Sequence, residues 1–227
     1  IGDDDIIMKI RSILIFTCLS TLLFSPLAAT DIGEVFQKIN HPRFYESVRP
    51  FAGGADNGPE LNRELYARAK ETGIVDLKNH YLYFSMDNAT GGFVRTYVLY
   101  FSPEGRPIFV GSERNSGPDG RYADYFALCQ DAASNWADCT ESFFPKLTVR
   151  DLLSAGKQLE DTTASLLFLY YELPRKGTTV YLKLIFDPYA YEPADLKRMK
   201  KELAKFKKQK FPLTWDKKNR KLVISGV

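Results

Sequence analysis

Apolar residues recur at two spacings along the chain, and the spacing changes near Gly73. Before this glycine, Leu61, Leu65 and Ala69 lie four positions apart, which places their side chains on one face of a helix. Glycine is a common helix stop, so residues 59–73 are predicted to form a helix that ends at this glycine.

After Gly73 the apolar and polar positions alternate, which is the period of a strand. Three such runs, 81–86, 93–101 and 107–113, are separated by the turn sequences DNATGG and SPEGR. Short turns join antiparallel neighbours. The three runs therefore predict a three-stranded meander.

Three further segments are predicted to be helical. A short helix after the N-terminal segment ends at His41-Pro42, and residues 122–136 have helical character. Thr148 precedes Asp151 by three positions, an imperfect capping box that indicates the start of a short helix.

The second half of the chain repeats both patterns. Residues 163–173 and 178–187 are strand-like and are joined by PRKG, which predicts a hairpin. In the second of these strands apolar residues alternate with Tyr181 and Lys183, as in a sheet with one buried and one partly wet face. Residues 192–209 give the clearest helix of the chain. Its apolar stripe consists of Leu196, Met199, Leu203 and Phe206.

These elements predict an α+β fold with a mainly antiparallel sheet of five to seven strands and helices packed on one face. We expect a single domain over residues 30–227, whose last part, about 191–227, is a basic helix followed by a small hairpin that turns at 216–219.

The segment that begins at Met8 is typical of a signal peptide. Lys9 and Arg11 precede an apolar run, and Ala28 and Ala29 are small residues suited to cleavage. The chain is therefore divided into an upstream leader or scar (1–7), a signal peptide (8–29) and the exported protein (30–227). This export would be to the periplasm or the medium, with no membrane span after cleavage. An uncleaved N-terminal membrane anchor and a lipid-modified Cys18 are the alternatives.

Cleavage leaves two cysteines, Cys129 and Cys139, in an oxidising compartment, and this predicts a disulfide. A redox motif has C-x-x-C spacing, and a structural zinc site needs four ligands, so both fit less well. Free thiols are the remaining alternative.

Charge is distributed unevenly along the chain. The whole sequence has a net charge of +3, and residues 191–227 alone hold ten lysines, two arginines and four acidic residues, a net charge of +8. Such a basic region suits an anionic partner: a lipid surface, a polysaccharide or a protein. Nucleic acid is not expected outside the cytoplasm. The alternative interpretation is that these lysines form an ordinary solvated helix face.

Two groups of side chains are candidates for ligand binding. The first is the wet sheet face with Tyr181 and Lys183, and the second comprises the helix lysines Lys197, Lys200, Lys201, Lys205 and Lys208. Tyrosine offers a flat apolar body with a polar tip, which can stack on sugars or contact a peptide, although it also favours strands. Seven tyrosines lie on predicted strands: Tyr81, Tyr83, Tyr97, Tyr100, Tyr170, Tyr171 and Tyr181.

The sequence lacks the common catalytic motifs. It contains no G-x-S-x-G elbow, no P-loop and no H-E-x-x-H, and no catalytic residue is assigned. His41 and His80 are interpreted as structural or surface residues. Acidic residues at 117–141 offer an alternative, with Asp119 and Asp124 as speculative calcium ligands or as part of a hydrolytic pair.

The sequence therefore predicts an exported binding or interaction module of unknown ligand that contacts anionic surfaces through its basic C-terminal helix. Calcium is the one cofactor considered. A hydrolase that uses the 117–141 region, through carboxylates or calcium, is one alternative. A structural envelope protein, or an inhibitor of another exported enzyme, is the other.

Overall fold

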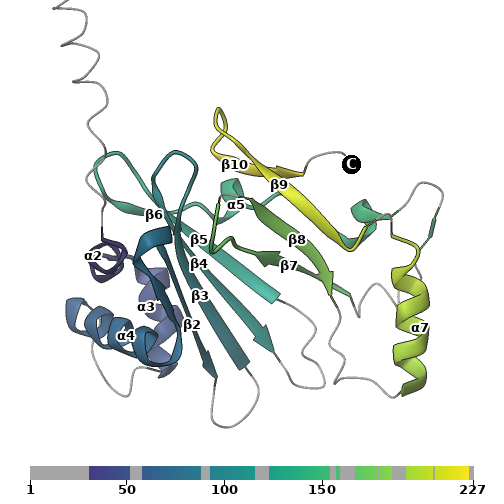
Figure 1. Cartoon of the computed structure of the whole chain (residues 1–227), viewed down its shortest axis with the longest axis horizontal. Helices are drawn as coiled ribbons and strands as arrows, with labels where there is room; N and C mark the ends of the chain where they lie inside the picture. The colour runs from purple at the N-terminus through teal and green to yellow at the C-terminus, as the bar shows by residue number, and fades with distance from the viewer. Residues whose placement is uncertain are drawn as a thin grey trace, which may run out of the picture. The chain divides into compact units, whose positions relative to one another are not determined.

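The structure is a computed structural model, shown in Figure 1. It describes residues 31–51, 58–87, 93–115, 123–153, 157–158, 167–177, 179–185, 193–206 and 208–224. The chain divides into a short unit, Ile1–Asp31, and a second unit, Ile32–Val227, to which the architecture below belongs. The predicted leader and signal peptide lie outside the described residues. Among the residues described, no helix is long and apolar enough to cross a membrane.

Three helices begin the second unit (Figure 1). They are α2 (Ile32–Gln37), α3 (Pro42–Val48), which is followed by the 3-10 turn η1 (Arg49–Phe51), and α4 (Pro59–Thr72). His41-Pro42 does not only end a helix, as predicted, but also begins the next one. Pro42 occupies the first turn of α3, where its missing N–H removes no hydrogen bond. The helix predicted over 59–73 is confirmed as α4.

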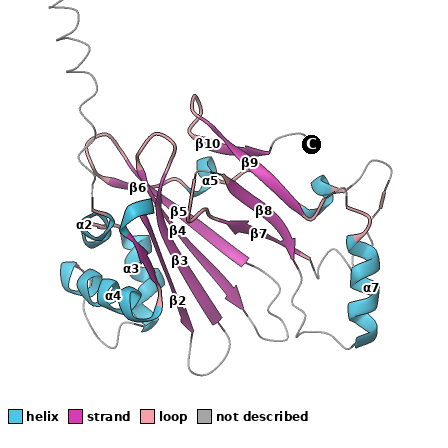
Figure 2. Ribbon diagram, viewed as in Figure 1, coloured by secondary structure: helices cyan, strands magenta, loops and turns pink. Residues whose placement is uncertain are grey.

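Six antiparallel strands form the first sheet, in the order β1-β2-β3-β4-β5-β6 (Figure 2). Their bounds are β1 Ile74–Asp76, β2 Tyr81–Asp87, β3 Phe93–Phe101, β4 Pro107–Asn115, β5 Ala123–Gln130 and β6 Trp136–Asp138, with the 3-10 turn η2 (Leu77–Asn79) after β1. The predicted meander of three strands is confirmed as β2, β3 and β4.

The helix predicted over 122–136 is wrong. This segment forms β5, a turn, and the start of β6, which pair with each other and extend the sheet beyond β4. Successive residues of β5 face two different cores: Ala127 packs in one cluster and Leu128 in the other. The 122–136 segment has four alanines and no β-branched residue, so its composition resembles that of a helix although it pairs as strands.

A second sheet of four strands has the order β10-β9-β8-β7, again antiparallel. Its strands are β7 Phe168–Glu172, β8 Val180–Ile185, β9 Lys210–Asp216 and β10 Lys221–Ile224. Both predicted hairpins are therefore confirmed. The expected single sheet of five to seven strands is corrected to two sheets, because among the described strands β7 to β10 pair only with one another.

The remaining elements are α5 (Thr140–Phe143), the 3-10 turn η3 (Val149–Leu152) and α7 (Pro193–Leu203). The side chain of Asp151 accepts hydrogen bonds from the backbone N–H of Thr148 at 2.6 Å and from its hydroxyl at 2.7 Å. The predicted cap thus forms, although it starts a single 3-10 turn. Met199, Leu203 and Phe206 of the predicted apolar stripe are buried.

The six-stranded sheet is the middle layer of the unit. On one face Leu82, Phe84, Leu99 and Phe109 pack against helices α2, α3 and α4. On the other face Tyr81, Tyr100, Ile108 and Val110 pack against the second sheet. Helices α2, α3 and α4 therefore cover one face of the first sheet, and the second sheet covers the other. The prediction that helices pack on one face alone is corrected, because α7 contributes Met199 and Leu203 to the core on the side of the second sheet.

Cys129 and Cys139 lie within disulfide-bonding distance, with their Cα atoms 5.8 Å apart. Cys129 is near the end of β5 and Cys139 follows β6, so the bond crosses the β5–β6 hairpin. The bridge predicted from the sequence is thus present at the base of a hairpin rather than at the end of a helix.

Candidate functional site

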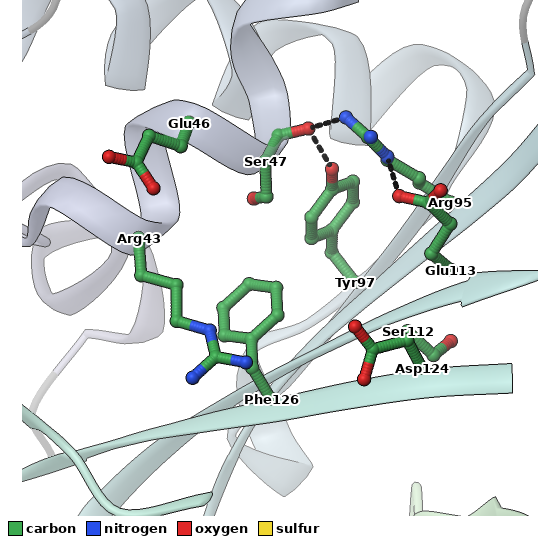
Figure 3. A pocket seen from close by; sticks show the side chains of 9 residues that line it. All are labelled: Arg43, Glu46, Ser47, Arg95, Tyr97, Ser112, Glu113, Asp124 and Phe126. Carbon is green, nitrogen blue, oxygen red and sulfur yellow. Dashed lines mark hydrogen bonds and ion pairs between the residues drawn. The ribbon is translucent and has the colours of Figure 1, made fainter.

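A charged cleft lies between helix α3 and strands β3, β4 and β5 (Figure 3). Its volume is about 210 Å³, and most of its walls are charged or aromatic side chains. The residues that line it are Arg43, Glu46, Ser47, Arg95, Tyr97, Ser112, Glu113, Asp124 and Phe126. The cleft therefore lies at the boundary between the helical layer and the middle of the six-stranded sheet.

Arg95 organises one wall of the cleft (Figure 3). Its Nε donates to Glu113 Oε2 at 2.6 Å, and its Nη1 donates to the carbonyl oxygen of Ser47 at 2.5 Å. The hydroxyl of Tyr97 donates to the same carbonyl at 2.8 Å. Carbonyls in the last turn of a helix lack partners inside the helix, and a positive charge there is favourable. Arg95 and Tyr97 thus fix the C-terminal end of α3 on the sheet.

Arg43 forms the opposite wall. Its Nη1 contacts Asp138 Oδ2 at 2.5 Å, and its guanidinium carbon lies 5.3 Å from the centroid of the Phe126 ring. Burial raises the pKa of Asp138, but hydrogen bonds from Thr140 and the charge of Arg43 together outweigh burial and lower this pKa below its usual value. The carboxylate is therefore ionised at neutral pH and ties α3 to the end of β6.

Phe126 reaches the cleft because its cross-strand neighbour has no side chain. Gly111 of β4 is the register partner of Phe126 of β5, and a Cβ atom at Gly111 would overlap the aromatic ring. The ring thus lies across the strand and stacks beneath Arg43.

Replacing Arg95 with leucine should lower the free energy of unfolding by roughly 1–3 kcal/mol, because Glu113 and the Ser47 carbonyl would each lose a donor in a half-buried setting. Urea unfolding measures this change. The control is Arg63→Leu, whose ion pair with Glu60 is exposed and 3.7 Å long, and which should change stability by less than about 0.5 kcal/mol. Equal effects of the two variants would show that the Arg95 contacts do not stabilise the fold.

The two other carboxylates of the cleft, Glu46 and Asp124, are exposed and have no ion-pair partner among the described residues. Asp119, the second speculative calcium ligand, lies outside those residues. In the part of the chain that is described, no three His, Cys, Asp or Glu side chains gather as a metal site. The calcium site therefore stays a prediction.

Region 117–141, on which the hydrolase hypothesis depends, is mainly strand where it is described. Asp131 caps the β5–β6 turn, since its Oδ1 accepts from the backbone N–H groups of Ala133 and Asn135, each at 2.8 Å. Hydrogen bonds from the Asn135 backbone lower the pKa of Asp131 the most. Asp131 and Asp138 thus stabilise the local backbone and contribute no free carboxylate pair.

The two histidines occupy structural positions. His41 Nδ1 accepts from the backbone N–H of Arg43 at 3.2 Å and caps α3. His80 has a φ of 49° at the turn before β2, and its ring centroid lies 5.1 Å from that of Phe101. Neither histidine lines the charged cleft, so no serine–histidine arrangement forms there.

The predicted binding pair on the wet sheet face is already engaged within the protein. Lys183 contacts Glu172 at 2.6 Å, and Lys210 contacts the second oxygen of Glu172 at 2.6 Å. The ammonium group of Lys210 also lies 3.9 Å from the centroid of the Tyr181 ring. Burial raises the pKa of Glu172, but the two lysines outweigh it and lower this pKa overall. Tyr181 and Lys183 are thus held in a local network.

The predicted helix lysines divide into two groups. Lys205 contacts Glu202 at 2.5 Å. Lys197, Lys200, Lys201 and Lys208 are exposed and have no acidic partner among the described residues. Within the described part of the chain, four of these five lysines thus form no ion pair, and their role in binding stays a prediction.

Sequence reasoning did not find the charged cleft. The one usable signal was the position of Arg95 and Glu113 on either side of a short turn, which makes them register partners on adjacent strands. Their contact with α3 joins residues 48 positions apart and has no local signal.

No protein-family model matches the chain, and no curated protein matches its sequence significantly. Among solved structures, the fold is similar to a domain of an uncharacterized protein from Porphyromonas gingivalis W83. The TM-score is 0.50 and the sequence identity is 11%, over 86% of this chain and 97% of that chain. At this identity the similarity concerns the fold alone.

Proposed function

We propose that the protein is an exported binding module that uses its basic C-terminal region to hold an anionic polymer. The observation that carries this proposal is the set of exposed lysines of α7 and the segment after it that have no intramolecular acidic partner among the described residues. Two other lysines of this region do pair with acidic side chains: Lys205 with Glu202, and Lys210 with Glu172 of β7.

The spacing of the lysines on α7 supports a single contact surface. Lys197, Lys200 and Lys201 are three and four positions apart, so they share one face of the helix. Met199 and Leu203 are buried, so the opposite face packs into the core. The lysines therefore project from a helix whose orientation is set by its apolar side.

The same packing favours a polymer over insertion into a lipid bilayer. An amphipathic membrane helix buries its apolar face at the lipid interface. Here Met199, Leu203 and Phe206 already pack in the protein core and are not available to lipid. The binding surface would therefore act by charge alone, as suits a solvated polyanion such as an acidic polysaccharide.

Export is the second part of the proposal, and the disulfide across the β5–β6 hairpin supports it. Such bonds persist in oxidising compartments and are rare in the cytosol. An exported protein with a basic surface meets acidic polysaccharides directly, whereas nucleic acid is scarce there.

Charge reversal at Lys197, Lys200 and Lys201 should weaken binding to heparin by roughly a hundredfold or more, since each lysine near an anionic surface contributes about 1 kcal/mol. Affinity is measured at two salt concentrations, and wild-type binding should fall at the higher one because salt screens exposed charges.

The control variant reverses the same number of charges at Lys70, Lys78 and Lys146, which lie outside the basic C-terminal region. It should retain most of the affinity. Equal losses in the two variants would indicate a response to net charge alone, and salt-independent binding would remove the proposal. Stronger binding to anionic vesicles than to heparin would favour the lipid alternative.

A hydrolase has less support from the geometry. Of the acidic side chains in the charged cleft, Glu113 is committed to Arg95, and Glu46 and Asp124 are exposed. A structural or inhibitory role within the envelope stays a hypothesis that a co-purified partner would test.

A further inference from the structure

Five tyrosines surround a second cavity, distinct from the charged cleft. Its volume is about 220 Å³, and it lies between the six-stranded sheet and the β7 edge of the second sheet. The tyrosines are Tyr81, Tyr83, Tyr125, Tyr170 and Tyr171. Four of them were singled out in the sequence as strand tyrosines, and neither the charged cleft nor the basic surface uses them. We call this space the tyrosine cavity.

One wall of the tyrosine cavity is a rigid aromatic cluster. The rings of Tyr125 and Tyr171 meet edge to face with centroids 5.2 Å apart, and Phe144 lies 4.6 Å from Tyr171. The backbone N–H of Tyr171 donates to the hydroxyl of Tyr125 at 3.4 Å. The hydroxyl of Tyr171 donates to the carbonyl of Pro145 at 3.4 Å. These contacts hold the rings in place before any ligand arrives.

The opposite wall offers a hydrogen-bonding group that the protein itself does not use. Tyr81 is 7% exposed, and its hydroxyl has no hydrogen-bond partner among the described residues. Burial raises the pKa of Tyr81 to about 12, so the hydroxyl keeps its proton at any physiological pH. This hydroxyl is therefore free to form a hydrogen bond with a ligand hydroxyl.

Among the described residues that line the cavity, none carries a free charge. Its one carboxylate, Glu172, is neutralised by Lys183 and Lys210. At the Tyr81 end, the β7–β8 turn is held to β1 by the ion pair of Arg175 with Asp76, at 2.9 Å. A charged ligand would find no partner of opposite charge among these residues. A neutral molecule with many hydroxyl groups would have a smaller desolvation cost on entering the cavity.

The size and chemistry of the lining define the ligand. Val98 and Val110 add aliphatic surface, and Thr96 and Ser112 add two hydroxyl groups. Pockets for drug-sized molecules have volumes of about 300–1,000 Å³, so this smaller cavity suits a single ring. The faces of the tyrosine rings can pack against the apolar face of a saturated ring, and the hydroxyl groups of the cavity can form hydrogen bonds with polar groups at its edge.

From this arrangement we propose that the tyrosine cavity binds one neutral sugar ring, either a free monosaccharide or a residue of a glycan. The ring stacks against the wall formed by Tyr125 and Tyr171. A hydroxyl of the sugar bonds the phenol of Tyr81. This site is independent of the basic surface, which lies on other residues.

The test is a titration of the full chain with glucose, galactose and N-acetylglucosamine, followed by amide chemical shifts in NMR spectra. At least one sugar should bind at millimolar concentration and shift amides of β2 and β7. Tyr81→Phe removes only the hydroxyl, and it should raise the dissociation constant about fivefold, the loss of one hydrogen bond.

The matched control is Tyr100→Phe. Tyr100 is the register partner of Tyr81 and lies in the same core, but it does not line the tyrosine cavity, so sugar affinity should not change. Thermal melting of both variants checks that each is folded. Charge reversal at Lys197, Lys200 and Lys201 should also leave sugar binding intact, which separates this site from heparin binding.

Three results would overturn the proposal: no shifts with any of the three sugars, shifts that map away from β2 and β7, or equal affinity in the wild type and Tyr81→Phe. Saturable binding of p-cresol at the same amides without binding of any sugar would also overturn it, and would assign the cavity to an aromatic side chain.

Discussion

Replacing Phe109 with alanine should lower the free energy of unfolding by roughly 3–5 kcal/mol, the largest effect expected for a single substitution in this protein. Phe109 is fully buried on β4 beneath the helical layer. Its ring centroid lies 5.1 Å from that of Phe44, 5.8 Å from Tyr97 and 6.0 Å from Phe126. Its removal would leave a cavity where the helical layer, the sheet and the wall of the charged cleft meet.

Urea unfolding followed by circular dichroism measures the change. Leu77→Ala is the control, since this leucine is 56% exposed and should change stability by less than about 0.5 kcal/mol. A loss below about 1 kcal/mol for the Phe109 variant would mean that the helical layer does not depend on this packing.

Removal of the disulfide, as Cys129→Ser with Cys139→Ser, should lower the free energy of unfolding by about 3 kcal/mol. The bond closes a loop between positions ten residues apart, and it restricts the unfolded chain accordingly. Ion pairing of Arg43 with Asp138, next to Cys139, should also weaken, which would loosen the charged cleft.

Treatment of the wild-type protein with a thiol reductant should reproduce the loss of stability, and the same treatment should leave the double variant unchanged. Mass spectrometry of protein from its native compartment gives an independent measure. Two alkylatable thiols in the native protein would contradict both the bridge and the proposed export.

The elements that the sequence predicts correctly have a residue composition that agrees with their structure. Strands β2, β3 and β4 contribute side chains to both cores, yet their aromatic and β-branched residues and the turn sequences between them identify them as strands. The 122–136 segment, which contains β5, has four alanines and no β-branched residue, and this composition favours the wrong prediction of a helix. Local propensity is overridden here by strand pairing with β4 and β6.

The number of sheets was not accessible to the same reasoning. Hairpins are local, and both β7–β8 and β9–β10 follow from their turns. Whether a hairpin joins an existing sheet or starts another depends on edge pairing between distant strands, which leaves no pattern in either segment. The sequence therefore predicts which segments form hairpins, but it does not predict which sheet each hairpin joins.

The sites show the same division. The exposed lysines of α7 could be identified from sequence, because exposure follows from the amphipathic pattern. The roles of Tyr181 and Lys183 could not, since Glu172 and Lys210 reach them across strands. The tyrosine cavity depends on the approach of β7 to β2 and β5, and only three-dimensional structure brings those tyrosines together.

Helices α2, α3 and α4 precede every strand that covers them, and this order affects biosynthesis. The last strand of the six-stranded sheet ends at Asp138, 66 residues after α4 ends at Thr72. At ribosomal rates of roughly 5–20 residues per second, synthesis of these residues takes about 3–13 s. Until then, Phe36 and Phe44 lack part of the sheet that buries them. During that interval these apolar side chains are exposed, so the nascent chain can aggregate or bind chaperones. Because the chain is not yet folded, it can also still pass through a translocation pore.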